Sequence, residues 1–292
     1  MLPNEIVKKI RHIEICTRRL LSGSLAGDSR SAVKGSGLEF DQIREYQQGD
    51  DIRFVDWNSS SRMNKLLVKQ YIEERNRTII LAVDVSASGV YSSSHELRSD
   101  IMAQIAGVLA LVAEYGKDAV GLLLFSDEIE AYMPPGKGKK HTRAVLEKAF
   151  THISKRKQTN ISVALEHLAQ LRNNGGIVVL ISDFIQVEDE RYRKIVRQVA
   201  KKYDLIAVRC LDAHEQSLPS CGFVTIEDSE TGALCTLDMR SQQGIKLREF
   251  LQQRLQDQAG IFKKCGADLL DISIGKPFVG DIIKFFRRRM TY

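Results

Sequence analysis

The stretch LAVDVSAS, residues 81–88, places a carboxylate and two hydroxyl groups directly after an apolar run. Asp84, Ser86 and Ser88 stand at alternate positions, with one small apolar residue between each pair. Oxygen ligands of these kinds suit hard divalent cations such as Mg²⁺. A turn just past a strand end lets alternate side chains point at one ion. The pattern is weak by itself, because serines often cap turns.

Two more oxygen-bearing residues stand where neighbouring elements are expected to end or begin. Thr159 lies just ahead of a predicted helix in KRKQTNISVAL, and Asp183 ends the apolar run GGIVVLISD. Ligands of an open parallel sheet bind at the carboxyl ends of its strands, so these side chains are expected to meet at one edge. The alternative is that the serines cap turns and Asp183 caps a helix. The predicted Mg²⁺ or Mn²⁺ site consists of Asp84, Ser86, Ser88, Thr159 and Asp183.

The elements that must position these residues follow one another in a regular order after residue 77. Apolar runs alternate with amphipathic stretches, which predicts an α/β fold with a parallel sheet covered by helices on both faces. The strands are expected at residues 77–86, 118–126, 175–184, 205–212 and 267–274, with short hairpins at 129–133 and 222–238. The helices are expected at residues 96–116, 140–153, 160–173, 188–204, 240–259 and 279–289.

The preceding residues 1–76 are predicted to form a separate helix and β-rich segment, with residues 77–292 as the α/β domain. Helical spacing covers residues 4–21, a Gly/Ser-rich loop covers 22–37, and short extended pieces follow. Charged and aromatic residues concentrate in the extended part: Arg44, Asp50, Asp51, Arg53, Asp56 and Trp57. They are interpreted either as ion pairs that brace the segment, with the tryptophan packed against the following core, or as a partner-docking surface.

Net charge is +6 and the cations are unevenly distributed along the 292 residues. Residues 134–157 contain eight Lys or Arg and one Glu. Such a cluster suits nucleic acid or an acidic protein surface. Without interleaved aromatic residues or a nucleic-acid motif, a solvated face is favoured and nucleic-acid binding is not expected.

The compartment is expected to be the cytoplasm. No apolar stretch is long enough to cross a bilayer, and the first 21 residues mix charges without the apolar centre of a signal peptide. Five scattered cysteines and six scattered histidines form no pattern of a disulfide frame or a zinc site.

The motif D-x-S-x-S, with a later Thr and a later Asp, resembles the metal-ion-dependent adhesion site of von Willebrand factor A domains. The stretch KGSGLEFDQIREYQQGDDIRFVDWNSSSRMNKLLVKQYIEER, leading into LAVDVSAS and LISDF, resembles the bacterial DUF fifty-eight family of von Willebrand A-like proteins. The resemblance covers residues from about 10 to about 210. It implies a von Willebrand A-like core and association with MoxR-type AAA+ ATPases, as an adaptor or chaperone partner.

The resemblance also implies roles for the individual site residues. Ser86, Ser88 and Thr159 would bind the ion directly, whereas Asp84 and Asp183 would act mostly through water. The sixth coordination position would be open to a partner's carboxylate. This sequence departs from the pattern at Asn160, where Asp is frequent, and at Gly89, where Met is common.

Two classes of function follow. The first is a protein-binding adaptor without enzymatic activity, acting on a MoxR-type ATPase and possibly on its substrate protein. The alternative is a metal-dependent phosphohydrolase or nuclease that uses Asp84 and Asp183. Ser86 stands where a dehalogenase-type phosphotransferase needs a second Asp. No phosphate-binding loop of the G-x-x-x-x-G-K-[ST] type occurs, so ATP hydrolysis is assigned to a partner.

Overall fold

The computed structural model describes residues 38–73, 77–86, 97–154, 156, 158–172, 175–185, 190–212, 218, 222–227 and 234–290. These residues divide into two compact units, one that ends with residue 73 and one that begins with residue 77. The predicted helix at residues 4–21 and the loop at 22–37 lie outside the described residues.

The small unit is built on an antiparallel pair of strands, β1 (Leu38–Glu45) and β2 (Leu67–Glu73). A 3₁₀ turn, η2 (Ile52–Phe54), and a short helix, α2 (Trp57–Met63), connect the two strands. The side chain of Asp56 caps α2 by accepting a hydrogen bond from the Ser59 backbone N–H at 3.2 Å.

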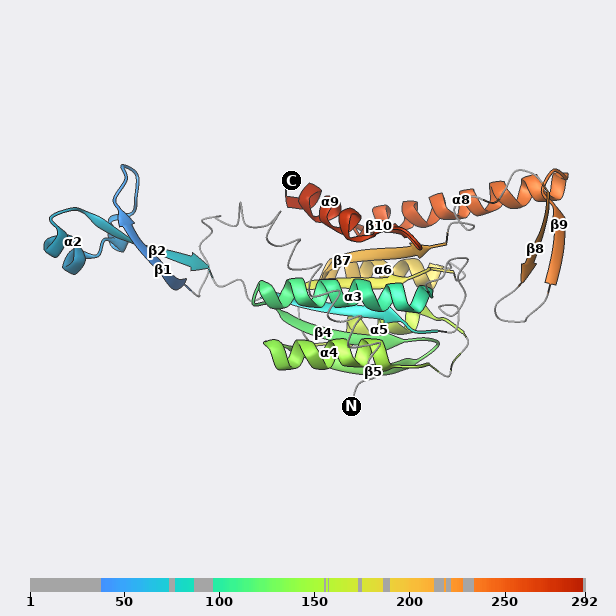
Figure 1. Cartoon of the computed structure of the whole chain (residues 1–292), viewed down its shortest axis with the longest axis horizontal. Helices are drawn as coiled ribbons and strands as arrows, with labels where there is room; N and C mark the ends of the chain where they lie inside the picture. The colour runs from blue at the N-terminus through green and yellow to red at the C-terminus, as the bar shows by residue number, and fades with distance from the viewer. Residues whose placement is uncertain are drawn as a thin grey trace. The chain divides into compact units, whose positions relative to one another are not determined.

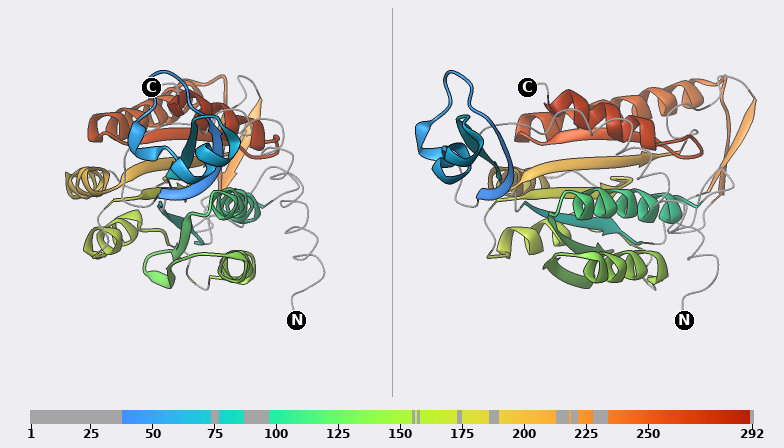
Figure 2. Two further views of the ribbon diagram at one scale, coloured as in Figure 1. Left: turned by 90° about the vertical axis from the view of Figure 1, so that its left-hand side faces the viewer. Right: turned by 60° about the vertical axis from the view of Figure 1, so that its left-hand side comes forward.

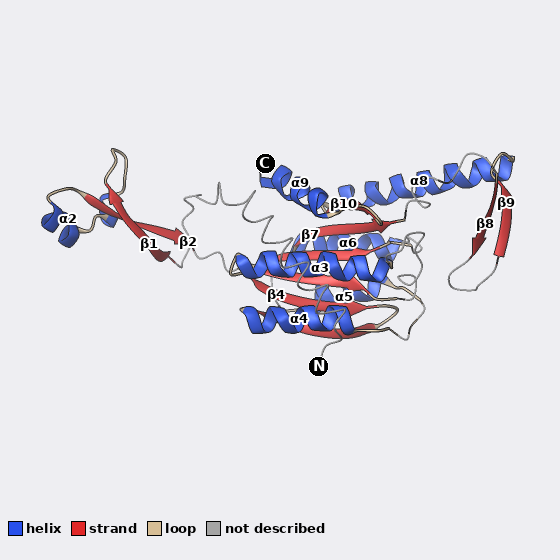
Figure 3. Ribbon diagram, in the orientation of Figure 1, coloured by secondary structure: helices blue, strands red, loops and turns tan. Residues whose placement is uncertain are grey.

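The large unit contains a six-stranded sheet in the order β10-β7-β6-β3-β4-β5 (Figures 1 and 3). Five strands run parallel, and β5 pairs antiparallel with β4 at one edge. The predicted mostly parallel α/β sheet is therefore confirmed. The strands are β3 (Thr78–Asp84), β4 (Ala119–Phe125), β5 (Ile129–Gly136), β6 (Ile177–Ser182), β7 (Asp204–Leu211) and β10 (Asp268–Ser273).

Helices cover both faces of this sheet, because alternate residues of each buried strand point to opposite sides (Figure 2). Leu81 and Val83 of β3 pack in the core beneath α3 (Arg98–Tyr115), α4 (Lys139–Thr151) and α9 (Val279–Met290). Ile80 and Ala82 pack in a second core on the other face. That core lies beneath α5 (Ile161–Gln170), α6 (Glu190–Lys202) and the C-terminal part of α8 (Gln242–Cys265).

Helix α8 is longer than the sequence indicates. The expected end at residue 259 is wrong, because the helix continues through Gly260 and ends at Gly266, whose φ of 78° forms a left-handed cap. Glycine inside a helix costs about 1 kcal/mol relative to alanine. Burial of Ile261 and Phe262 against the sheet offsets this cost.

The N-terminal part of α8 carries a hairpin formed by β8 (Phe223–Glu227) and β9 (Leu234–Asp238) (Figure 1). The joint between hairpin and helix requires glycine at position 244. A Cβ atom there would lie 2.6 Å from the Asp238 carbonyl oxygen. Close packing at this joint fixes the hairpin to the helix. No helix in the described ranges combines the length and apolar character needed to cross a membrane.

Candidate metal site at the carboxyl ends of the strands

Asp84 is the last residue of β3 and is only 4% exposed. The Ser86 backbone N–H donates to its Oδ1 at 3.0 Å, and the Ser182 hydroxyl donates to its Oδ2 at 2.8 Å. Ser182 ends β6, the neighbour of β3 in the sheet. The turn after β3 and the adjacent strand therefore fix the Asp84 carboxylate from two sides.

Asp183 follows β6 directly and is also buried. The Arg98 guanidinium in the first turn of α3 donates to its Oδ2 at 2.5 Å, and the Ile185 backbone N–H donates to its Oδ1 at 3.0 Å. Phe184 adopts a left-handed conformation, with φ of 57°. Asp183 is thus held by a sharp turn and by a buried arginine.

The two carboxylates influence each other electrostatically. Burial raises the pKa of Asp84 to about 6, and the negative charge of Asp183 adds to this rise. Hydrogen bonds from Ser86 and Ser182 oppose it by stabilising the charged form. Negative charge held away from water at this edge favours a cation.

Two hydroxyl groups complete the candidate ligand set. Thr159 Oγ1 donates to Ser86 Oγ, and the two oxygens are 2.6 Å apart. Neighbouring ligands of an octahedral Mg²⁺ with bonds of ~2.1 Å lie ~3 Å apart, so a small opening of this pair suffices. A carboxylate has about four lone-pair sites, so it can accept hydrogen bonds and still present an oxygen to a cation. The donor set therefore fits a hard cation.

Asn160, where the resemblance favours an Asp, has a structural role. Its side chain caps α5 by accepting from the Ser162 backbone N–H at 3.1 Å. Its backbone N–H donates to the Ser126 carbonyl oxygen at 2.9 Å. Asn160 thereby fixes the backbone next to Thr159 to the end of β4.

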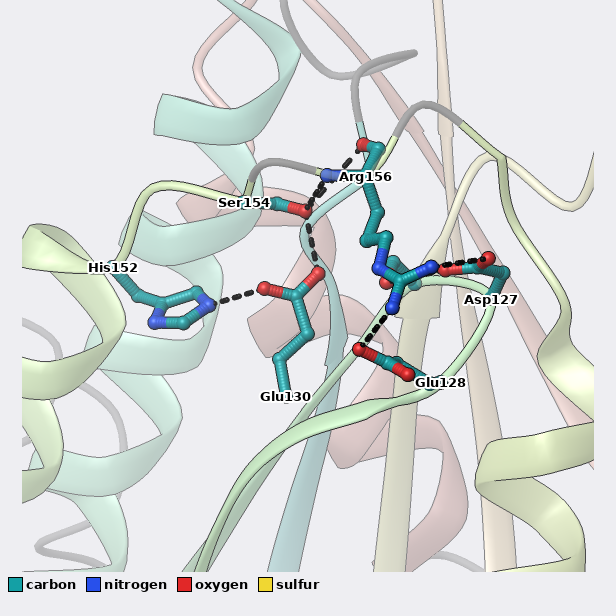
Figure 4. A network of polar contacts seen from close by, with 7 residues as sticks. Asp127, Glu128, Glu130, His152, Ser154 and Arg156 are labelled. Carbon is teal, nitrogen blue, oxygen red and sulfur yellow. Dashed lines mark hydrogen bonds and ion pairs between the residues drawn. The ribbon is translucent and has the colours of Figure 1, made fainter.

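A network of polar side chains holds the rest of the loop that carries Thr159 (Figure 4). Glu130 of β5 accepts hydrogen bonds from His152 at 2.6 Å and from Ser154 at 2.5 Å. Arg156 donates to Glu128 at 2.8 Å and contacts Asp127 at 3.5 Å, both in the β4–β5 turn. The network ties the α4–α5 loop to the edge hairpin.

Glu130 is the centre of this network and is a charged acceptor. Burial raises its pKa, but hydrogen bonds from Ser154, Ser126 and His152 outweigh burial and leave the pKa below its ordinary value. Both Ser154 and His152 contact Glu130 (Figure 4), so the serine hydroxyl is not activated by the histidine.

We expect Glu130→Ala to loosen the loop that carries Thr159 and to weaken Mg²⁺ binding by about 10-fold, the lower range for residues that orient metal ligands. Hydrogen exchange of residues 152–160 and calorimetric titration with Mg²⁺ measure the two effects. Glu147→Ala, an exposed change on α4, is the matched control and should alter neither. Unchanged exchange and affinity in Glu130→Ala would show that the network does not position Thr159.

The structure brings four of the five predicted metal-site residues to the same sheet edge. The carboxyl end of β3 carries Asp84 and Ser86, the end of β6 carries Asp183, and the loop before α5 carries Thr159. Ser88 lies outside the described residues. In the described part of the chain, no three His, Cys, Asp or Glu residues cluster as a metal site. This part therefore lacks the carboxylate-rich set expected of a two-metal nuclease.

Sequence reasoning missed Arg98 and Ser182, which contact the two carboxylates. The one available signal for Arg98 was an arginine in the first turn of a helix whose later residues are largely apolar. Nothing in the sequence singled out Ser182 beyond its position next to Asp183.

In the small unit, the predicted pairing of arginines with aspartates is confirmed. Arg44 binds both carboxylate oxygens of Asp50 at 2.7 Å, which lowers the pKa of Asp50, and Arg53 binds Asp51 at 2.6 Å. Asp56 caps α2 and lies 3.6 Å from Lys69. The Trp57 side chain is 64% exposed, and its packing against the following core stays a prediction.

The sequence profile of the family described as "Protein of unknown function DUF58" matches residues 42–259. This range covers 218 of the 292 residues, well over half of the chain. The chain belongs to this family. The DUF58 match includes the charged stretch of the small unit, Asp84, Thr159 and Asp183, and it extends into α8.

Curated relatives of this DUF58 protein come from mycobacteria. "Uncharacterized protein Rv1480" of Mycobacterium tuberculosis and "Uncharacterized protein Mb1516" of Mycobacterium bovis are each 25% identical over 287 residues. Each alignment covers 98% of this chain and 90% of the relative.

Solved structures with a related arrangement include the conserved hypothetical protein BatB from Bacteroides thetaiotaomicron. It is 14% identical with a TM-score of 0.46, covering 74% of this chain and all of that chain. The SpRpn10 VWA domain is 9% identical with a TM-score of 0.41, covering 72% of this chain and 94% of that one.

Proposed function

We propose that this protein is a metal-dependent protein-binding adaptor that works with a MoxR-type AAA+ ATPase in the cytoplasm. The observation that supports it most is the buried Asp84–Asp183 pair beside the hydroxyls of Ser86 and Thr159. Bound Mg²⁺ or Mn²⁺ would supply a Lewis-acidic centre that accepts a carboxylate oxygen from a partner.

Each residue of the site has a distinct task in this proposal. Ser86 and Thr159, with Ser88, provide neutral oxygen ligands that leave the ion with net positive character. Asp84 and Asp183 orient water molecules and supply the balancing negative charge. Arg98 holds the Asp183 carboxylate in one orientation. A partner's Asp or Glu then gains a directional contact that a surface ion pair, at about 0–1 kcal/mol, does not provide.

The alternative, a phosphohydrolase or nuclease, has less support from the described residues. Asp84 accepts hydrogen bonds on both oxygens and is deeply buried, so it is poorly placed as a nucleophile. The His152 and Ser154 side chains both contact Glu130 and form no nucleophile–base pair. We therefore assign the site to binding.

We expect capture of a AAA+ ATPase from the native organism by immobilised protein to require Mg²⁺ and to fail in excess EDTA. Asp84→Asn is expected to lose capture in Mg²⁺, because it removes one of the two balancing charges. Asp281→Asn, an exposed change of the same kind on α9, is the control. Equal capture in Mg²⁺ and EDTA would contradict the mechanism, and phosphatase or nuclease turnover that Asp84→Asn abolishes would support the alternative.

A further inference from the structure

A basic groove lies between α6 and α8, with a volume of about 860 Å³. Two of its thirteen lining residues are acidic, Glu190 and Asp257, and five are Lys or Arg, so cations dominate. The five cations of the basic groove are Arg193, Lys194, Arg197, Arg254 and Lys264.

The positive charge of the basic groove is available to a ligand. Within the described ranges, Lys194, Arg197 and Lys264 form no ion pair, and Arg193 contacts Glu190 only at the long distance of 3.5 Å. Exposed pairs of this kind contribute little and do not hold the charge in place. An anionic partner therefore meets a surface with excess positive charge.

An aromatic side chain gives the basic groove an apolar contact point. Phe250 of α8 lines the groove and is 62% exposed. None of the α8 residues between Gly244 and Gln258 is buried. An exposed phenylalanine beside cations is complementary to an amphipathic segment with acidic and apolar side chains. The groove lies between two helices, which is a suitable binding site for a third helix.

The basic groove is joined to the metal site by a chain of buried contacts. Gln258, between the lining residues Asp257 and Gly260, donates to the Phe184 carbonyl oxygen at 2.7 Å. Arg209 of β7 donates to Gln258 Oε1 at 2.8 Å. Phe184 follows Asp183, so one wall of the groove is fixed to the segment that carries a site carboxylate.

We propose that the basic groove binds an acidic, amphipathic segment of a partner protein, with its carboxylates on α6 and α8 cations and an apolar side chain on Phe250. The inference extends the proposed adaptor function, because a second carboxylate of the same partner reaches the ion. Two attachment points on one rigid frame raise overall affinity beyond either alone.

A protein segment fits this surface better than a nucleic acid does. Single-stranded nucleic acids bind where several aromatic side chains stack with successive bases. Phe250 is the one aromatic residue among those that line the groove in the described part of the chain. Glu190 and Asp257 would also repel a continuous phosphate backbone, whereas a peptide can place neutral side chains opposite them.

The test uses a fluorescein-labelled helical peptide with Glu on one face and Leu on the other, measured by fluorescence anisotropy against the full chain. We expect it to bind, and expect Arg197→Glu and Phe250→Ala each to weaken binding about tenfold. Lys201→Glu makes the same charge change on α6 outside the groove lining and should have less than about a twofold effect. A peptide with Gln in place of Glu should not bind.

The same measurement separates the basic groove from the metal site. Groove binding should persist in EDTA and in Asp84→Asn, so failure of the adhesion-type mechanism would leave it intact. Absence of peptide binding, or equal binding by wild type, Arg197→Glu and Phe250→Ala, would overturn the inference. Tighter binding of oligothymidylate that Arg197→Glu abolishes would also overturn it, and would assign the groove to nucleic acid.

Discussion

Replacing Arg98 with Met is expected to lower the free energy of unfolding by about 3–5 kcal/mol, the range for breaking a buried ion pair from one side. The Arg98 and Asp183 side chains are 5% and 1% exposed and lie 2.5 Å apart. Loss of the arginine leaves the buried Asp183 carboxylate without its counter-charge, next to the carboxylate of Asp84. Urea denaturation measures the change.

A matched pair of variants separates charge from packing at this position. Arg193→Met removes an arginine from an exposed pair and should cost less than about 1 kcal/mol. Arg98→Met combined with Asp183→Asn should be more stable than Arg98→Met alone, because the Asp183 charge is no longer buried without its partner. If Arg98→Met costs less than about 1 kcal/mol, the arginine does not balance the charge of Asp183.

Asp84→Asn should weaken Mg²⁺ binding by at least about 10- to 100-fold, the range for residues that orient metal ligands. The substitution keeps the size of the side chain and an oxygen that can accept from Ser182, but removes a negative charge. It also removes the repulsion from Asp183, which adds to the effect of burial in raising the pKa of Asp84. Metal affinity should therefore fall without a loss of stability.

Isothermal titration with Mg²⁺ and urea denaturation test the two parts of this expectation. Asp281→Asn should bind Mg²⁺ like wild type. Wild-type affinity in Asp84→Asn would remove Asp84 from the metal site. Loss of stability together with affinity would indicate that Asp84 serves the fold, through the hydrogen bonds from Ser86 and Ser182, rather than the ion.

The positions of most elements in the large unit could be predicted because burial periodicity is a local property. The run at residues 77–86 is apolar on both faces, and the observed β3 is buried on both faces. Local charge pairs could also be predicted, since Arg44 near the end of β1 and Asp50 in the following turn are only six residues apart.

Other boundaries depended on tertiary contacts. A short hairpin was expected at residues 129–133, yet these residues belong to one strand, β5, that continues through Pro134 and Pro135 to Gly136. Proline is tolerated there because β5 lies at the edge of the sheet. The edge position follows from strand order, which the periodicity of a single segment does not contain.

In the candidate metal site, too, the sequence predicted some features and the tertiary structure decided others. Asp84, Ser86, Thr159 and Asp183 could be chosen from the sequence, because oxygen-bearing residues after predicted parallel strands are expected at one edge of the sheet. The fold then placed Thr159 Oγ1 at 2.6 Å from Ser86 Oγ, across 73 positions of sequence.

Tertiary structure alone decided the contacts of three residues that sequence analysis did not single out: Arg98, Ser182 and Gln258. Ser182 reaches Asp84 because β6 lies beside β3, and Arg98 reaches Asp183 because α3 begins at the edge where β6 ends. Gln258 reaches Phe184 because α8 crosses the same end of the sheet. Sequence alone indicated most residues of the candidate site, since residue type and local burial pattern are properties of short segments. Their hydrogen-bond partners depended on strand order and helix placement, which arise from the packing of the whole chain.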